Sequence, residues 1–258
     1  MEQVQHNIDA FLSRRTQALL SIVDPIVSSK FGPAWTPVVM AIIDNESGGK
    51  IGIEAAHETR FSAVLQTRDG ATKTVKKALG LMQVIPRNIA DYATKYGPVY
   101  YEDMVGTTAE AAAIQIKIGV HVLKTMINSM VGYLPSLKVT SPSLDPDNLS
   151  FILMAYAIGQ RPVQNMIQRL KMAAIPLTLA NAEQAEPDLG KPQNQPYFYA
   201  KKNIEKNQWY CRSTQKYRSK FRPFFAFGSW TDGFSFAQSL IWKGSLTGKA
   251  PALNISKR

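Results

Sequence analysis

The segments PVVMAIIDNESGG at residues 37–49 and ALGLMQVIP at residues 78–86 decide the expected fold of this 258-residue chain. The Thr36-Pro37 pair predicts a helix start, because a hydroxyl caps the first turn and proline fits the first helical position. The glycine pair at residues 48–49 is expected to end this helix. Aliphatic residues at helical spacing predict one buried face, formed by Val38, Val39, Ile42 and Ile43.

Glu46 lies in the last turn of this predicted helix. Unpaired carbonyl groups and the negative end of the helix dipole surround that position, so they disfavour a carboxylate and favour the protonated acid. Partial burial would act in the same direction. A glutamate at a helix end is usually a solvated or capping residue, so Glu46 alone does not define a function.

The region between the two opening segments changes its pattern to short β runs. Residues 61–77 read FSAVLQTRDGATKTVKK, and Asp69-Gly70 is a hairpin turn signal. We therefore expect a polar β-hairpin insertion at about residues 60–78, exposed as a flap. After it, Gly80 allows a close backbone approach, and Gln83 presents an amide from an otherwise apolar segment.

The remaining patterns predict a mainly α fold. A capping pattern at Thr107-Thr108 opens a long helix ending near Met130. Further helices are expected over residues 2–31 (broken at Pro25), 86–92, 149–158, 162–174 and 199–209. Tyrosine- or proline-bearing stretches are expected to be loops, at residues 96–106, 132–148 and 181–196.

Composition limits the chemistry of the chain. Cys211 is the single cysteine, so an internal disulfide or a cysteine-based metal site is excluded. The three histidines, His6, His57 and His121, match no zinc spacing. We expect neither a metal nor a cofactor.

Positive charge is concentrated late in the chain. Residues 191–258 hold 13 Lys/Arg against 2 Asp/Glu, which accounts for the whole net charge of +11, and they also hold 14 of the 25 aromatic residues. Such a segment could bind an anionic cell wall, an acidic membrane or nucleic acid, or it could be a solvated basic face. The N-terminal sequence lacks the apolar core of a signal peptide, and no run is long enough for a membrane span. We therefore expect no export signal.

The order ES-G, GLMQ and AY resembles the soluble lytic transglycosylase family, the goose-type branch of lysozyme-like folds. The matching segments are Glu46-Ser47 with the glycines that follow, Gly80 to Gln83 with Pro86, the region of Gly119, Ala155-Tyr156 with Gly159 and Val163, and QPYFYAKKN at residues 195–203. The resemblance covers about residues 36–206. It implies a lysozyme-like domain over residues 36–210, preceded by a helical segment at 1–35 and followed by an irregular basic aromatic extension at 211–258.

The resemblance also implies the chemistry. Such enzymes cleave the β-1,4 bond between N-acetylmuramic acid and N-acetylglucosamine in peptidoglycan, using one glutamate first as acid and then as base, and they leave a 1,6-anhydro end. Glu46 would be that glutamate. The supporting residues for sugar contact would be Ser47, Gly80, Met82, Gln83, Tyr156 and Tyr199. Met82 and Tyr156 could equally be core residues.

Three departures from the family pattern leave alternatives open. Glu46 and Gln83 lie 37 residues apart, about twice the family's usual separation, and Ala157 replaces the amide of the usual AYNAG. The region after Phe221 has no family counterpart. A muramidase that hydrolyses the same bond would need a second carboxylate, for which the candidates are Asp44, Glu54, Glu58 and Asp69.

An enzyme of this class without an export signal would fit a phage particle. We expect a virion component that acts in the periplasm or cell wall during genome delivery, with residues 211–258 contacting other virion proteins, a membrane or nucleic acid. A virion structural protein that keeps the fold with weak activity is the alternative.

Overall fold

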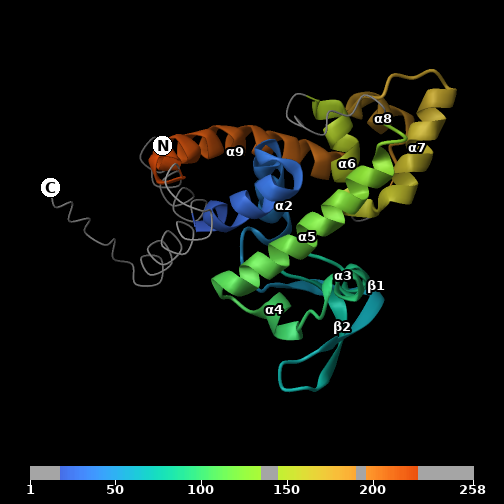
Figure 1. The fold of residues 1–258 in the computed structure, drawn as a ribbon. Helices are drawn as coiled ribbons and strands as arrows, with labels where there is room; N and C mark the ends of the chain where they lie inside the picture. The colour runs from blue at the N-terminus through green and yellow to red at the C-terminus, as the bar shows by residue number, and fades with distance from the viewer. Residues whose placement is uncertain (1–17, 135–144, 190–195, 226–258) are drawn as a thin grey trace, which may run out of the picture.

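The computed structural model describes residues 18–134, 145–189 and 196–225, which form a mainly helical body with one two-stranded antiparallel sheet (Figure 1). A helix over residues 18–31 comes first. It is followed by η1 (Pro33–Trp35), α2 (Thr36–Ser47), β1 (Glu54–Gln66), β2 (Thr72–Leu79), α3 (Pro86–Tyr96), α4 (Tyr101–Val105), α5 (Ala109–Met130), α6 (Pro146–Ile158), α7 (Gln160–Met172), α8 (Leu179–Ala185) and α9 (Pro196–Phe225). Within these described ranges, no helix combines the length and the apolar character that a bilayer crossing needs.

Helix α2 has the limits predicted from the first sequence segment, but Thr36 does not cap it: the N-cap residue is Trp35, and the Thr36 hydroxyl donates to Asp24 Oδ1 at 2.6 Å. Pro37 stands in its first turn, and Gly48 ends it in the left-handed conformation at φ 58°. The Gly48 N–H donates to Asp44 O at 3.1 Å, which satisfies one of the terminal carbonyls. Every residue from Thr36 to Ile43 is buried, and not only the predicted face, so α2 is a core helix whose last turn alone approaches solvent.

Helix α5 crosses the molecule and packs directly against the GLMQ segment. The Thr108 hydroxyl caps its first turn by accepting from Ala111 N at 3.2 Å, as the sequence predicted. Near the middle of α5, Gly119 leaves the space that the Met82 side chain fills. A Cβ atom at Gly119 would stand 2.3 Å from Met82 Sδ and 2.7 Å from Met82 Cβ.

Gly119→Ala is therefore expected to lower the free energy of unfolding by about 1–3 kcal/mol, the usual cost of overpacking a core. Met82 is completely buried, so it has little room to move away from the added methyl group. Urea unfolding followed by circular dichroism measures the change. Gly132→Ala is the matched control, because nothing lies within 4 Å of its Cβ position. Equal stability of the two variants would contradict the predicted clash.

The predicted hairpin is present and projects from the helical body (Figure 1). Its turn lies at Asp69-Gly70, where the Thr67 and Ala71 backbones pair at 2.9 Å. Strand β1 begins at Glu54, seven residues earlier than the sequence suggested, and register shifts interrupt its pairing with β2. These irregularities explain the missed start, because the residues before Phe61 lack the regular alternation that identifies a strand.

Several predicted boundaries were wrong. The helix over residues 18–31 continues through Pro25, since buried residues on both sides hold it in the core despite the lost backbone hydrogen bond. The expected loops at 96–106 and 181–196 contain α4 and α8. Helices α3 and α6 extend beyond their predicted ranges of 86–92 and 149–158. The predicted segments at residues 2–17, 135–144 and 190–195 lie outside the described residues, wholly or in part.

Helix α9 differs most from expectation. It runs from Pro196 to Phe225, about three times the predicted length of the helix at residues 199–209. The extension predicted to be irregular over residues 211–258 is therefore helical up to Phe225, and its remainder, 226–258, lies outside the described residues. It packs along α2 and crosses α6 (Figure 1). An ion pair from Lys206 to Asp44 and a hydrogen bond from Tyr199 to Glu46 join α9 to the last turn of α2. A segment late in the chain therefore covers the end of the early helix.

Candidate active site

Glu46 lies at the covered end of α2 with Tyr199 of α9 against it. The Tyr199 hydroxyl donates to Glu46 Oε1 at 2.5 Å. Burial raises the pKa of Glu46 to about 7, and the Tyr199 hydrogen bond opposes that rise by stabilising the carboxylate. This carboxyl can therefore give up and take back a proton near neutral pH.

Tyr156 of α6 belongs to the same cluster. Its hydroxyl donates to Met82 O at 2.7 Å, which links α6 to the GLMQ segment. Burial, followed by the negative charge of Glu46, raises the pKa values of both Tyr156 and Tyr199 well above the ordinary tyrosine value. Both phenols therefore stay protonated and act as hydrogen-bond donors around the glutamate.

The other predicted sugar-contact residues have backbone roles in this structure. The Ser47 hydroxyl donates to Ile43 O at 2.9 Å and accepts from Gly49 N at 3.1 Å, which caps the end of α2. Gly80 is buried, adopts φ 78° and donates its N–H to Ile53 O at 2.8 Å. Ser47 and Gly80 thus shape the backbone that carries Glu46 and the GLMQ turn.

Met82 and Gln83, the two remaining residues predicted to contact sugar, differ in their exposure. Met82 is fully buried against Gly119. Gln83 is half-buried and sits at φ 48°, and its amide donates to Gly80 O at 2.8 Å and Ile53 O at 3.3 Å. The structure therefore brings Glu46, Met82, Tyr156 and Tyr199 together, whereas sugar contact by any of the six supporting residues stays a prediction.

The four candidate second carboxylates have partners of their own. Asp44 pairs with Lys206, and Glu54 accepts from the Tyr101 hydroxyl at 2.5 Å. Glu58 lies 3.8 Å from Lys76 on the hairpin surface. Asp69 stays inside its own turn, where Thr67 and Ala71 donate to it and lower its pKa. Burial and Tyr199 account for the pKa of Glu46, with no contribution from a second carboxylate of the described chain.

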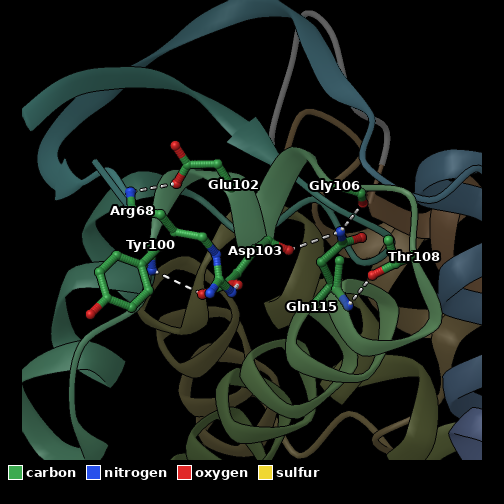
Figure 2. Close-up of polar contacts among 8 residues, drawn as sticks. Arg68, Tyr100, Glu102, Asp103, Gly106, Thr108 and Gln115 are labelled. Atoms are coloured by element: carbon green, nitrogen blue, oxygen red, sulfur yellow. Dashed lines mark hydrogen bonds and ion pairs between the residues drawn. The ribbon is translucent and has the colours of Figure 1, made fainter. Parts of the chain in front are cut away.

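Sequence reasoning missed Gln115, a completely buried residue of α5 that holds both ends of the hairpin. Its Oε1 accepts from Gly52 N at 3.2 Å and from Leu81 N at 3.1 Å. Its Nε2 donates to Asp103 O at 3.1 Å and Gly106 O at 3.0 Å (Figure 2). The available signal was a lone amide on the apolar face of a predicted helix.

A second group of contacts fixes the tip of the hairpin on α4. The Arg68 side chain pairs with the buried carboxylate of Asp103 and stacks over the Tyr100 ring at 5.2 Å (Figure 2). The Arg68 backbone N–H donates to Glu102 Oε2 at 3.2 Å. The hairpin is therefore held at its tip and at its base, and its base continues directly into the turn beside Glu46.

The described residues contain no group of three or more His, Cys, Asp or Glu side chains that could hold a metal ion. They do contain a helical body with one carboxyl of raised pKa at the end of a core helix, hydrogen-bonded to a tyrosine. This combination defines a class of proteins that can carry out acid–base catalysis with a single carboxyl.

The comparison with family models agrees with this class. The model described as "Transglycosylase SLT domain" matches residues 28–176, more than half of the chain. The chain belongs to this family, which at the family level indicates lytic transglycosylase-type cleavage of peptidoglycan and binding of peptidoglycan as substrate. The match contains Glu46, Gln83 and Tyr156 but ends before Tyr199. No curated protein and no solved structure matches the chain.

Proposed function

We propose that the chain is a lytic transglycosylase that cleaves the bond between N-acetylmuramic acid and N-acetylglucosamine, with Glu46 as its single acid and base. The observation that supports this most is the buried Glu46 carboxyl, whose pKa is raised to about 7. Since the four candidate second carboxylates are bound elsewhere, the geometry favours a one-carboxylate reaction over an inverting hydrolysis, which needs a second carboxylate to activate water.

The reaction begins with proton transfer from Glu46 to the glycosidic oxygen. The bond from C1 of the muramoyl ring to that oxygen breaks, and its electron pair leaves with the N-acetylglucosamine hydroxyl. The Glu46 carboxylate then removes the proton of the muramoyl C6 hydroxyl, and O6 forms the new bond to C1. The glutamate ends protonated as it began, and the product carries a 1,6-anhydro ring without uptake of water.

Tyr199 positions the glutamate for both steps. Its hydroxyl occupies Oε1, so the transferable proton lies on Oε2. After the first transfer, the same hydrogen bond stabilises the carboxylate and keeps its pKa from rising further. Burial thus keeps the acid protonated near neutral pH and its carboxylate a strong base, while the Tyr199 hydrogen bond keeps the acid strong enough to give up its proton.

Tyr199→Phe is expected to move the alkaline limb of the kcat/KM pH profile to higher pH. Loss of the hydroxyl removes the interaction that lowers the pKa of Glu46, so the carboxyl stays protonated further into the alkaline range. The measurement is kcat/KM on soluble glycan strands across pH 5–9. Tyr197→Phe is the control, because it removes a tyrosine hydroxyl from the same helix that donates to Ala182 O and Glu186 O and not to Glu46. A limb that stays in place or moves to lower pH would contradict the role of Tyr199.

Mass analysis of the products tests the proposed reaction itself. Digestion of purified peptidoglycan in ¹⁸O-labelled water is expected to give muropeptides with unlabelled 1,6-anhydro ends. A muramidase would instead give reducing ends that contain one labelled oxygen. Labelled reducing ends as the main product would replace the transglycosylase proposal with the hydrolytic alternative.

We propose in addition that the enzyme is carried in a phage particle and opens the cell wall during genome delivery, with residues 211–258 as the segment that docks to other virion proteins. The concentration of positive charge and aromatic residues after residue 190 supports a docking role. An acidic membrane or nucleic acid would be the other partners for such a surface.

Deletion of residues 226–258 is expected to leave clearing of purified peptidoglycan unchanged, because α2, the hairpin and Tyr199 all precede the deletion. The same deletion is expected to reduce incorporation into assembled particles. Zymography and immunoblotting of purified particles measure the two effects. Normal incorporation of the shortened chain would exclude residues 226–258 as the docking segment.

A further inference from the structure

A cavity lies away from Glu46, between the helix over residues 18–31, α3 and α5. Its volume is about 430 Å³, within the range of sites that bind small molecules. None of its lining residues belongs to the candidate active site described above. The cavity therefore needs an explanation of its own.

One wall of this cavity is a preassembled aromatic cluster of Tyr92, Tyr96 and His121. The Tyr92 and Tyr96 ring centroids lie 4.7 Å apart, and each ring meets the His121 ring edge-on, at 5.4 and 5.1 Å. The Tyr96 hydroxyl lies 3.4 Å from His121 Nδ1. Tyr96 is nevertheless 49% exposed, and the Lys95 ammonium lies over its ring at 5.3 Å, so the cluster presents an exposed ring beside a positive charge.

Lysine side chains border the same cavity. Lys30 and Lys117 line it directly, and Lys95 and Lys124 lie close enough that, together with burial and Lys30, they lower the pKa of His121. Within the described residues, Lys30, Lys117 and Lys124 form no ion pair. Exposed lysines are common on protein surfaces, but here unneutralised lysines stand beside a cavity with an aromatic wall.

We infer that this cavity is a second binding site, for a sugar that carries a carboxylate, as the muramoyl peptide of peptidoglycan does. The apolar CH face of a sugar ring can pack on Tyr92 and Tyr96, while the carboxylate lies between Lys30 and Lys117. The choice of the muramoyl peptide, as opposed to another anionic sugar, rests on the proposed function.

Such a site would hold a glycan strand that is not being cleaved. Binding one part of the cell wall at this cavity raises the effective concentration of neighbouring strands at Glu46. Neutral N-acetylglucosamine would lack the group that the lysines recognise, so the site would distinguish peptidoglycan from chitin-like strands.

The test is a titration of the full chain carrying Glu46→Gln, which prevents turnover of any substrate. Muramyl dipeptide, N-acetylglucosamine and inorganic phosphate are added separately, and binding is followed by calorimetry and by the NMR signals of Tyr92 and Tyr96. We expect muramyl dipeptide to shift both tyrosines and to bind more tightly than either other probe. Lys30→Gln with Lys117→Gln should weaken its binding by about tenfold or more, the loss expected for one charge-assisted contact.

Lys202→Gln is the matched control, because Lys202 is an exposed lysine of α9 that does not line the cavity. Unchanged muramyl dipeptide affinity in the Lys30/Lys117 variant, or shifts confined to other residues, would overturn the site. Equal binding of phosphate would overturn recognition of the sugar. Because binding is measured without cleavage, an inactive wild-type enzyme would contradict the proposed function while leaving this result intact.

Discussion

Glu46→Gln is expected to lower the rate of glycan cleavage by about 1,000-fold, since general acid–base groups contribute about 10²–10⁴-fold. The amide can still accept the Tyr199 hydrogen bond, so the local packing is preserved, but it can neither donate a proton to the glycosidic oxygen nor accept one from the C6 hydroxyl. Zymography and the rate of release of soluble muropeptides measure the loss. Clearing equal to that of the wild type would exclude Glu46 as the acid and base.

The same variant is expected to be more stable than the wild type at alkaline pH. The pKa of Glu46 is about 7 in the folded chain, against an ordinary value of 4.5, so the folded state binds this proton more tightly than the unfolded state does. Ionisation therefore destabilises the folded wild type as pH rises from about 4.5 through 7. At pH 8 the pKa shift lowers the free energy of unfolding of the wild type by about 3 kcal/mol. The Glu46→Gln variant, whose side chain is neutral, does not lose this stability.

At pH 4 both side chains are uncharged, so the stabilities of wild type and Glu46→Gln should nearly coincide. Urea unfolding at pH 4 and pH 8 checks both values. Glu58→Gln serves as control, because Glu58 is exposed and its contact with Lys76 is weak. If Glu46→Gln is inactive but more stable than the wild type at pH 8, its lost activity is not caused by unfolding. If it is less stable than the wild type at pH 8, the Glu46 charge is not buried as described.

The second large effect is expected at Gln115. Gln115→Leu keeps the approximate volume but leaves two backbone N–H groups and two carbonyls without their partners, those of Gly52, Leu81, Asp103 and Gly106. An unpaired buried polar group costs about 1–3 kcal/mol. Since two of these four contacts are only partly buried, we expect a total loss of about 3–5 kcal/mol in the free energy of unfolding.

The loss of these contacts should also displace residues beside Glu46. Gly52 and Leu81 are the two ends of the hairpin segment, and Leu81 precedes Met82, whose carbonyl accepts from Tyr156. Gln115→Leu is therefore expected to reduce cleavage even below its unfolding temperature. The control is Gln168→Leu on the exposed face of α7. A change of less than about 1 kcal/mol in Gln115→Leu would show that water replaces the lost partners.

The parts of this fold that could be read from the sequence are those determined by neighbouring residues. The limits of α2 follow from Pro37 and the glycine pair, and the start of α5 follows from the Thr108 hydroxyl. The turn of the hairpin follows from Asp69-Gly70. The direction of the pKa shift of Glu46 was also predicted, but burial raises this pKa in the structure, whereas the sequence argument placed the helix end first.

The rest depends on contacts between distant residues. The length of α9 could not be read from its weak amphipathic pattern, because its order comes from packing along α2 and α6. Gln115 binds Gly52 across 63 positions of the chain, which no local pattern encodes. The helix at Pro25 and the short α4 likewise form where packing outweighs local preference. The domain limits and the virion setting stay predictions.

The bond between Tyr199 and Glu46 joins residues 153 positions apart, and this separation has a consequence during synthesis of the protein. The ribosome releases α2 long before α9, so the nascent chain carries Glu46 without the phenol that later covers it. Translation must pass residue 199 before the acid acquires its final environment. Chains that stop before α9 would hold most of the family domain but leave this glutamate uncovered, and the site becomes complete only once the first turn of α9, which carries Tyr199, has been made.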